Sequence, residues 1–73
     1  MREWMEQARK SKGLTMKMAG SKLGISESYY SMIERGERQQ NLDIALAAKI
    51  SCVFGISLEY IVEQEQRIAR SSA

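Results

Sequence analysis

The spacing of the glycines restricts this fold more than any other feature of the sequence. The five glycines stand at positions 13, 20, 24, 36 and 55, and none of the 73 residues is proline. The segments between them carry apolar residues at helical spacing, and none alternates between apolar and polar residues as a half-buried strand does. Because glycine readily adopts the left-handed conformation in which helices end, the spacing predicts an all-α chain of short helices.

Residues that cap helices predict where these helices begin. Thr15, Ser26 and Ser57 are expected N-caps, and either Asn41 or Asp43 is expected to cap the fourth helix. The expected helices cover about 2–11, 16–23, 27–35, the stretch from the fourth cap to 54, and 58 onward, with glycines 13, 24, 36 and 55 as stops. The polar segment 64–73 is expected to fray or to continue the last helix loosely.

Apolar residues at helical spacing predict which faces are buried. The expected apolar positions are Trp4, Met5 and Ala8 in the first helix, Ile44, Ala47, Ile50, Ser51 and Phe54 in the fourth, and Leu58, Ile61 and Val62 in the fifth. One modest core of this kind fits a single domain in which 44% of the residues are hydrophobic. Function is therefore expected on the surface of one small fold.

The sequence lacks the residue types that several classes of enzyme require. It has no histidine, and its one cysteine, Cys52, has no partner for an internal disulfide. These absences exclude the usual zinc sites and histidine-based acid–base catalysis, and we find no nucleophile–base pair or phosphate-binding loop. We expect a protein that is not an enzyme and that uses no metal and no cofactor. Cys52 is expected to be a small apolar filler rather than a redox sensor.

Charge is distributed unevenly along the chain. Residues 1–38 hold eight Lys and Arg residues against five Asp and Glu, whereas residues 39–73 hold three against four. The basic half is a weak indication of a surface that faces nucleic acid. The first six residues carry charge and form no apolar signal segment, and no run approaches membrane-spanning length. A cytoplasmic protein with no membrane partner is therefore expected.

Four short stretches share a combined spacing that resembles a known family. They are Gly13-Leu14-Thr15, Leu23-Gly24-Ile25-Ser26, Ile33-Glu34-Arg35-Gly36 and Ile56-Ser57-Leu58. Over about residues 1–63 the pattern is similar to the phage-repressor, or Cro-like, helix-turn-helix regulators of the XRE type. The resemblance implies a five-helix, lambda-repressor-like DNA-binding domain at 1–63, in which the second and third helices form the helix-turn-helix. Residues 64–73 then form a polar tail or a helical extension.

The resemblance also implies how the interior is built. Gly24 permits the turn between the second and third helices, and Gly20, where the family usually has alanine, keeps their crossing point small. Arg9 and Glu34 match a charged pair of the family, and we expect them to form a partly buried, mainly structural salt bridge between the first and third helices. The positions that the family buries are those of Leu23, Ile25, Tyr30 and Ile33, with the Tyr30 hydroxyl expected at the rim.

The family match assigns roles on DNA, because the third helix of a helix-turn-helix lies in the major groove with its N-terminal residues toward the bases. The residues that match base-reading positions are Glu27, Ser28 and Met32. The residues expected at the DNA backbone are Thr15, Met16, Lys17, Tyr29, Ser31, Arg35 and Arg38. Structural alternatives stay open: glutamate at 27 also suits the positive end of a helix, methionine at 32 also fills gaps, and lysine at 17 is also an ordinary solvated side chain.

The chain departs from the family pattern near the start of the second helix. Met16 stands where the family commonly has a glutamine that clamps a phosphate, and Ala19 replaces a usual leucine. The leading hypothesis is a transcriptional regulator, expected to be a repressor, that binds operator DNA. Because Met16, Gln39, Gln40 and Glu27 reduce the expected phosphate contacts, the alternative hypothesis is a protein-interaction module that kept this fold and lost operator binding.

Dimerisation is expected for the leading hypothesis, since one small module with few basic residues binds DNA weakly and operators of this family are two-fold. The last helix and the segment before it offer more apolar surface than one small core needs. The expected homodimer surface comprises Val53, Ile56, Leu58, Ile61 and Val62.

Overall fold

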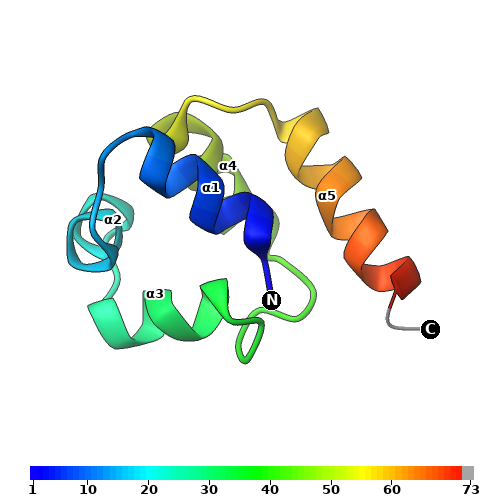
Figure 1. The fold of residues 1–73 in the computed structure, drawn as a ribbon, viewed down its shortest axis with the longest axis horizontal. Coiled ribbons are helices and arrows are strands. Elements are labelled where there is room, and N and C mark those ends of the chain that lie inside the picture. The colour runs from blue at the N-terminus through cyan, green and yellow to red at the C-terminus, as the bar shows by residue number, and fades with distance from the viewer. Residues whose placement is uncertain (72–73) are drawn as a thin grey trace.

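Five helices and no strand make up the part of the chain that the computed structural model describes, residues 1–71. They are α1 (Glu3–Ser11), α2 (Met16–Leu23), α3 (Glu27–Glu34), α4 (Ile44–Phe54) and α5 (Leu58–Ser71). In Figure 1, α1 crosses the centre of the molecule, α2 and α3 lie along one side and the lower edge, α4 lies behind α1, and α5 closes the opposite side. The expected all-α, five-helix fold is confirmed.

The predicted caps begin the helices. The side chains of Thr15 and Ser26 each accept a backbone N–H from the first turn of the following helix at 3.1 Å, and Ser57 does the same at 3.0 Å. Asp43, not Asn41, caps α4, with its carboxylate 2.7 Å from the amide nitrogen of Ala45. These short-range bonds satisfy amides that the first turn of a helix leaves without a backbone partner.

Two glycines determine how α2 meets α3. Gly24 ends α2 with φ 76°, a left-handed conformation that a residue with a Cβ adopts at a cost. Gly20 lies at the closest approach of the helices, where a Cβ would stand 3.0 Å from the carbonyl oxygen of Ile25 and 3.2 Å from that of Ser26. The chain can therefore turn sharply and still bring α2 and α3 into contact.

The core lies between α1, α2, α3 and α4, with one residue contributed by α5. Ile25, expected in the core, is only partly buried and packs against it. The buried apolar side chains are Trp4, Met5, Ala19, Leu23, Tyr30, Ile33, Leu46, Ala47, Ile50, Phe54 and Ile61.

Three apolar residues predicted for buried faces are exposed instead. Ile44 is 85% exposed, Leu58 45% and Val62 52%, so the predicted faces of α4 and α5 are wrong at these positions. Ile44 is the first residue of α4 and precedes the part of the helix that packs on the core. On α5, only Ile61 turns inward far enough to be buried.

Tyr30 lies deeper than the sequence predicts. Its side chain is fully buried, so the expectation that its hydroxyl reaches the rim is wrong. The hydroxyl makes no hydrogen bond to the residues that the structure describes. Burial, together with the neighbouring Glu34 carboxylate, raises the pKa of Tyr30 above its ordinary value. The Tyr30 hydroxyl is therefore a neutral group that lies beside the charged side chains of Arg9 and Glu34.

The segment after residue 63 continues α5 without a break as far as Ser71. Its residue Glu65 accepts hydrogen bonds from Arg2 and from the indole N–H of Trp4, and Ile68 packs against the core. The helical continuation is thus attached to the rest of the fold. The last part of the expected tail, residues 72–73, lies outside the described residues.

Cys52 is exposed, so the expectation of a buried apolar filler is wrong. It lines a shallow surface pocket between α2 and α4 together with Lys22 and Lys49. Ile50 and Phe54 occupy the buried face of α4 instead.

No single helix among residues 1–71 is long and apolar enough to cross a membrane. By length and composition alone, α4 and α5 taken together would suffice, and they are bent by 119° where they meet. The same residues contain no group of three or more His, Cys, Asp or Glu side chains that could hold a metal ion.

Candidate nucleic-acid interface

The helix-turn-helix pair presents α3 at an edge of the molecule. Figure 1 shows α3 along the lower edge, with its N-terminal end next to α2. Glu27 and Ser28, the first two residues of α3, are exposed, whereas Met32 is half-buried. Ser28 and Met32 are four residues apart and therefore share one face of the helix. The start of α3 thus offers two polar side chains to solvent. Met32, one turn further along, adds only a partly exposed apolar surface.

The remaining predicted backbone contacts on α3 lie at the sides of this exposed face. Tyr29 and Ser31 are half-buried, and the ring of Tyr29 packs against the core. Both keep part of their surface for contact with another molecule. Neither forms the tip of the helix, so they suit the walls of a groove better than base edges.

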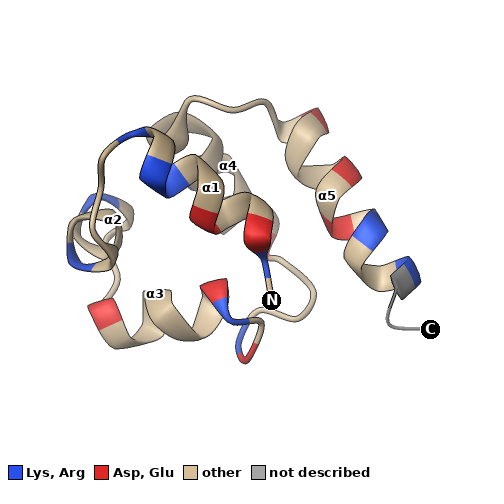
Figure 2. Cartoon of the chain, viewed as in Figure 1, with Lys and Arg blue, Asp and Glu red and all other residues tan. Residues whose placement is uncertain are grey.

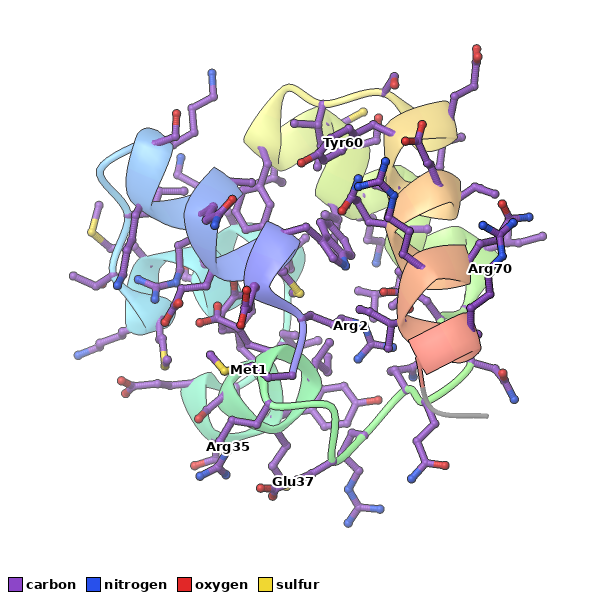
Figure 3. All side chains as sticks on the ribbon, turned by 45° about the vertical axis from the view of Figure 1, so that its right-hand side comes forward. Met1, Arg2, Arg35, Glu37, Tyr60 and Arg70 are labelled. Atoms are coloured by element: carbon purple, nitrogen blue, oxygen red, sulfur yellow. The ribbon has the colours of Figure 1, made fainter. Side chains whose placement is uncertain are left out.

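Two arginines follow the end of α3. Arg35 is exposed and forms an ion pair with Glu37 at 3.3 Å, and the two side chains project together in Figure 3. Arg38 is exposed and makes no ion pair with the residues described. Surface ion pairs contribute little to stability, so Arg35 can exchange Glu37 for a phosphate at small cost. Arg38, four residues after the end of α3, needs to release no carboxylate to do so.

The start of α2 supplies backbone donors rather than side chains. Thr15 uses its hydroxyl to cap the helix, and no hydrogen bond within the described part of the chain engages the amides of Met16 and Lys17. The Met16 side chain packs against the core, so only its N–H can contribute to the predicted backbone contact. Lys17 is exposed, and Figure 2 shows cationic segments on α2. This end of α2 suits a phosphate.

The arrangement of α2 and α3 is shared with a known protein family. A family model described as helix-turn-helix matches residues 5–61, which include α2, α3 and the turn between them. The chain belongs to the XRE-type helix-turn-helix family. Its members are DNA-binding transcriptional regulators, and the lambda-repressor-like fold expected from the sequence agrees with that membership. Neither the curated proteins nor the solved structures return a match to the chain.

The charged pair expected for the XRE-type fold is present inside the molecule. The Arg9 guanidinium donates to both carboxylate oxygens of Glu34, with distances of 3.0 Å from Nε and 3.2 Å from Nη2. Its third nitrogen donates to the carbonyl oxygen of Leu14 at 2.9 Å. The hydrogen bond with Glu34 raises the pKa of Arg9. The pair therefore ties α1 to α3 and to the loop before α2 of the helix-turn-helix.

A second buried arginine, Arg2, was missed by sequence reasoning. Its side chain is 4% exposed and lies 3.0 Å from a carboxylate oxygen of Glu65. The same guanidinium donates to the carbonyl oxygens of Ile33, Arg38 and Gln39, at 2.7 Å for Ile33 and 3.2 Å for Arg38. Figure 3 shows Arg2 between the start of α1 and α5. Arg2 therefore joins the loop after α3 of this XRE-type protein to its last helix.

The predicted homodimer residues do not form one surface. Ile61 is 1% exposed and belongs to the core, so little of its surface is open even where it lines the groove between α4 and α5. Val53 and Ile56 are half-buried, whereas Leu58 and Val62 are exposed. The last two line a groove of about 510 Å³ between α4 and α5, to which Ile44 also contributes. The spacing of apolar residues in α4 did not predict that Ile44 is exposed at the start of the helix.

Proposed function

We propose that the protein is a repressor that binds a two-fold DNA operator as a homodimer, with α3 in the major groove. The observation that carries this proposal is the exposed start of α3, where Glu27 and Ser28 face solvent directly after the turn that follows α2. In the helix-turn-helix docking geometry, these positions face base edges while the amides and nearby cations contact phosphates.

The chemistry of the exposed side chains favours particular bases. A carboxylate in a groove lined by phosphates is unfavourable unless it accepts a hydrogen bond from a base, and cytosine N4 is the suitable donor. Glu27 therefore specifies a C·G pair in each half-site. Ser28 both donates and accepts and so discriminates little, whereas Met32 offers apolar contact that suits a thymine methyl group.

Glu27→Gln is expected to change which base is preferred at one position of the half-site. Glutamine removes the repulsion from phosphates and pairs well with adenine, so non-specific affinity should rise and the preference should move from cytosine toward adenine by about 1–3 kcal/mol. The measurement is a base-preference profile on a randomised half-site. Met32→Ala should weaken the thymine preference at another position. If both variants leave the whole profile unchanged, α3 does not read bases as proposed.

The phosphate contacts predict a strong dependence of affinity on salt. Arg38→Ala should weaken binding to all sequences about equally and reduce the slope of log affinity against log salt by about 1, because one fewer phosphate is neutralised. Lys49→Ala, which removes an exposed cation from α4, is the matched control and should leave the slope unchanged.

An unchanged slope after both Arg35→Ala and Arg38→Ala would contradict the phosphate assignments. Gel retardation on mixed-sequence DNA at low salt tests the broader proposal. No retardation at all would instead support a protein-interaction module on the same fold.

A second copy of the chain is the proposed occupant of the groove between α4 and α5. Ile44, Leu58 and Val62 expose apolar surface there. The ends of α5 carry opposite charges, Glu59 in the first turn and Arg70 in the last, whereas Glu63 and Arg67 between them already pair with each other at 3.0 Å. Two copies related by a two-fold axis with antiparallel α5 helices would place opposite charges together.

Val62→Asp is expected to convert the homodimer to monomer, because a carboxylate at the centre of the apolar contact is buried without a partner. Analytical ultracentrifugation across micromolar concentrations measures the change. Met18→Asp, which places the same charge on an exposed apolar residue of α2, is the matched control and should still dimerise. An unaltered protein that sediments only at 8.3 kDa, with and without DNA, would contradict the dimer.

A further inference from the structure

Gln39 adopts a backbone conformation that is unusual for its residue type. Its φ of 55° is the one positive value at a non-glycine residue within residues 1–71. The left-handed region is unfavourable for a residue with a Cβ unless its surroundings hold it there. Gln39 lies in the loop between α3 and α4, so its contacts determine the path of the chain just after the DNA-binding helix.

The contacts of Gln39 join three parts of the fold. Its carbonyl oxygen accepts a hydrogen bond from Arg2, which is itself paired with Glu65 of α5. Its side-chain oxygen Oε1 accepts the backbone N–H of Asp43 at 3.1 Å, next to the start of α4. Its side-chain nitrogen Nε2 donates to the hydroxyl of Tyr29 on α3 at 2.8 Å. The strained backbone is therefore held by bonds at both the main chain and the side chain.

These contacts determine the direction of the Tyr29 hydroxyl. A backbone N–H can only donate, so the side-chain atom of Gln39 that faces Asp43 must be the oxygen. The atom that faces Tyr29 is then the nitrogen, which can only donate. The Tyr29 oxygen accepts this bond, and its own hydrogen remains available to an acceptor elsewhere.

We propose that Gln39 is a positioning residue for DNA binding, which holds the Tyr29 hydroxyl as a hydrogen-bond donor toward a phosphate oxygen of the DNA backbone. The inference rests on the proposed function, in which Tyr29 lies at the DNA backbone. Phosphate oxygens are acceptors, and side-chain hydroxyls are among the groups that contact them and set the register of a protein on the duplex. Gln39 itself need not contact the DNA.

A double-mutant cycle with Tyr29→Phe and Gln39→Gly tests this coupling. Glycine is suited to the positive φ and keeps the carbonyl that receives Arg2, so the variant removes only the side-chain bonds. Affinity for a fluorescent duplex of mixed sequence is measured at low salt. We expect Tyr29→Phe to weaken binding about tenfold and Gln39→Gly about three- to tenfold, since each disturbs one hydrogen bond to a charged group.

The double variant should bind no more weakly than Tyr29→Phe alone, because Gln39 then has no hydroxyl to orient. Unfolding of all four proteins by urea shows that each is folded under the binding conditions. Gln7→Ala, which truncates an exposed glutamine on α1 outside the proposed DNA-binding and dimer surfaces, is the matched control and should leave affinity unaltered.

Gln39→Glu provides a second cycle that remains informative if the glycine variant does not fold. A carboxylate can still accept the Asp43 N–H, but it presents only acceptors to Tyr29, so the hydroxyl must donate inward. The effect of the added charge is measured in the Tyr29→Phe background, where no hydroxyl is present, and subtracted. The inference predicts a further loss of affinity that appears only when the hydroxyl is present.

The outcomes separate this inference from the proposed function. If Tyr29→Phe leaves affinity unchanged, the Tyr29 hydroxyl does not contact DNA, and both the proposed hydroxyl contact and the inference are overturned. If Tyr29→Phe weakens binding while Gln39→Gly does not, or if the two losses add in full, the inference alone is overturned. A profile that responds to Glu27→Gln then still supports the base-reading role of α3.

Discussion

Glu34→Ala is expected to destabilise the fold by about 3–5 kcal/mol, because it leaves the Arg9 charge in the interior without its partner. The side chain of Glu34 is fully buried and that of Arg9 is 9% exposed, so water cannot replace the lost bonds. A chain of this length has a free energy of unfolding on the order of 4–11 kcal/mol. Urea unfolding should therefore show a much lower midpoint, and the variant should be close to unfolded at 37 °C.

The matched control replaces both charges with apolar residues of similar size, Arg9→Met with Glu34→Leu. This double variant should be destabilised less than either single variant, because no unpaired charge remains in the interior. The same comparison shows whether the charged pair stabilises the fold more or less than an apolar pair of similar size. Single variants that lose less than about 1 kcal/mol would show that the pair is solvated, as surface pairs are.

Arg2→Ala is the second change with a large expected effect, a loss of about 3 kcal/mol or more of unfolding free energy. It removes the donor to three carbonyl oxygens and the charge that faces Glu65. Glu65 would retain only the indole N–H of Trp4, at 2.9 Å, among the bonds described for it. The measurement is again urea unfolding, followed by tryptophan fluorescence, since Trp4 is bound to the same carboxylate.

Arg2→Lys keeps the charge but loses the planar fork that reaches several acceptors at once, so it should recover only part of the stability. Arg70→Ala is the control for loss of an exposed arginine and should change the stability by less than about 0.5 kcal/mol. If Arg2→Ala and Arg70→Ala behave alike, the contacts of Arg2 contribute nothing to the fold.

Helix boundaries could be predicted from the sequence because they depend on neighbours along the chain. Thr15 and Ser26 cap helices through bonds to amides three residues on, and Gly24 adopts the left-handed conformation that its position requires. The choice between Asn41 and Asp43 stayed open because both are good caps. The structure resolves it in favour of Asp43, whose carboxylate reaches two amides.

Burial was predicted less well, because periodicity gives the face of a helix and not what covers it. On α5 the apolar residues Leu58 and Val62 follow the same spacing as Ile61, yet only Ile61 reaches the core. Cys52 was expected inside for its small apolar side chain, and it lies on the outer side of α4. How the helices pack on one another determines which of these side chains are buried, and the spacing of apolar residues within one helix does not contain that information.

The candidate site was predicted mainly through the family pattern, which aligns Glu27 and Ser28 with an exposed helix start and pairs Arg9 with Glu34. The roles of Arg2 and Gln39 escaped that reasoning. The partners of Arg2 are backbone carbonyls and a glutamate 63 residues away, and no motif marks such contacts. A charged residue at the edge of the first helix has the sequence pattern of an ordinary solvated side chain.

The separation between Arg2 and Glu65 has a consequence for how the molecule acquires its structure. Contacts between residues so far apart in sequence form late, since the chain entropy lost in closing the loop must first be offset by nearer contacts. The helix-turn-helix pair depends on contacts between neighbours and can assemble early. The segment that follows α3, held by Arg2, is therefore expected to acquire its final path after α2 and α3 have paired and α5 has docked.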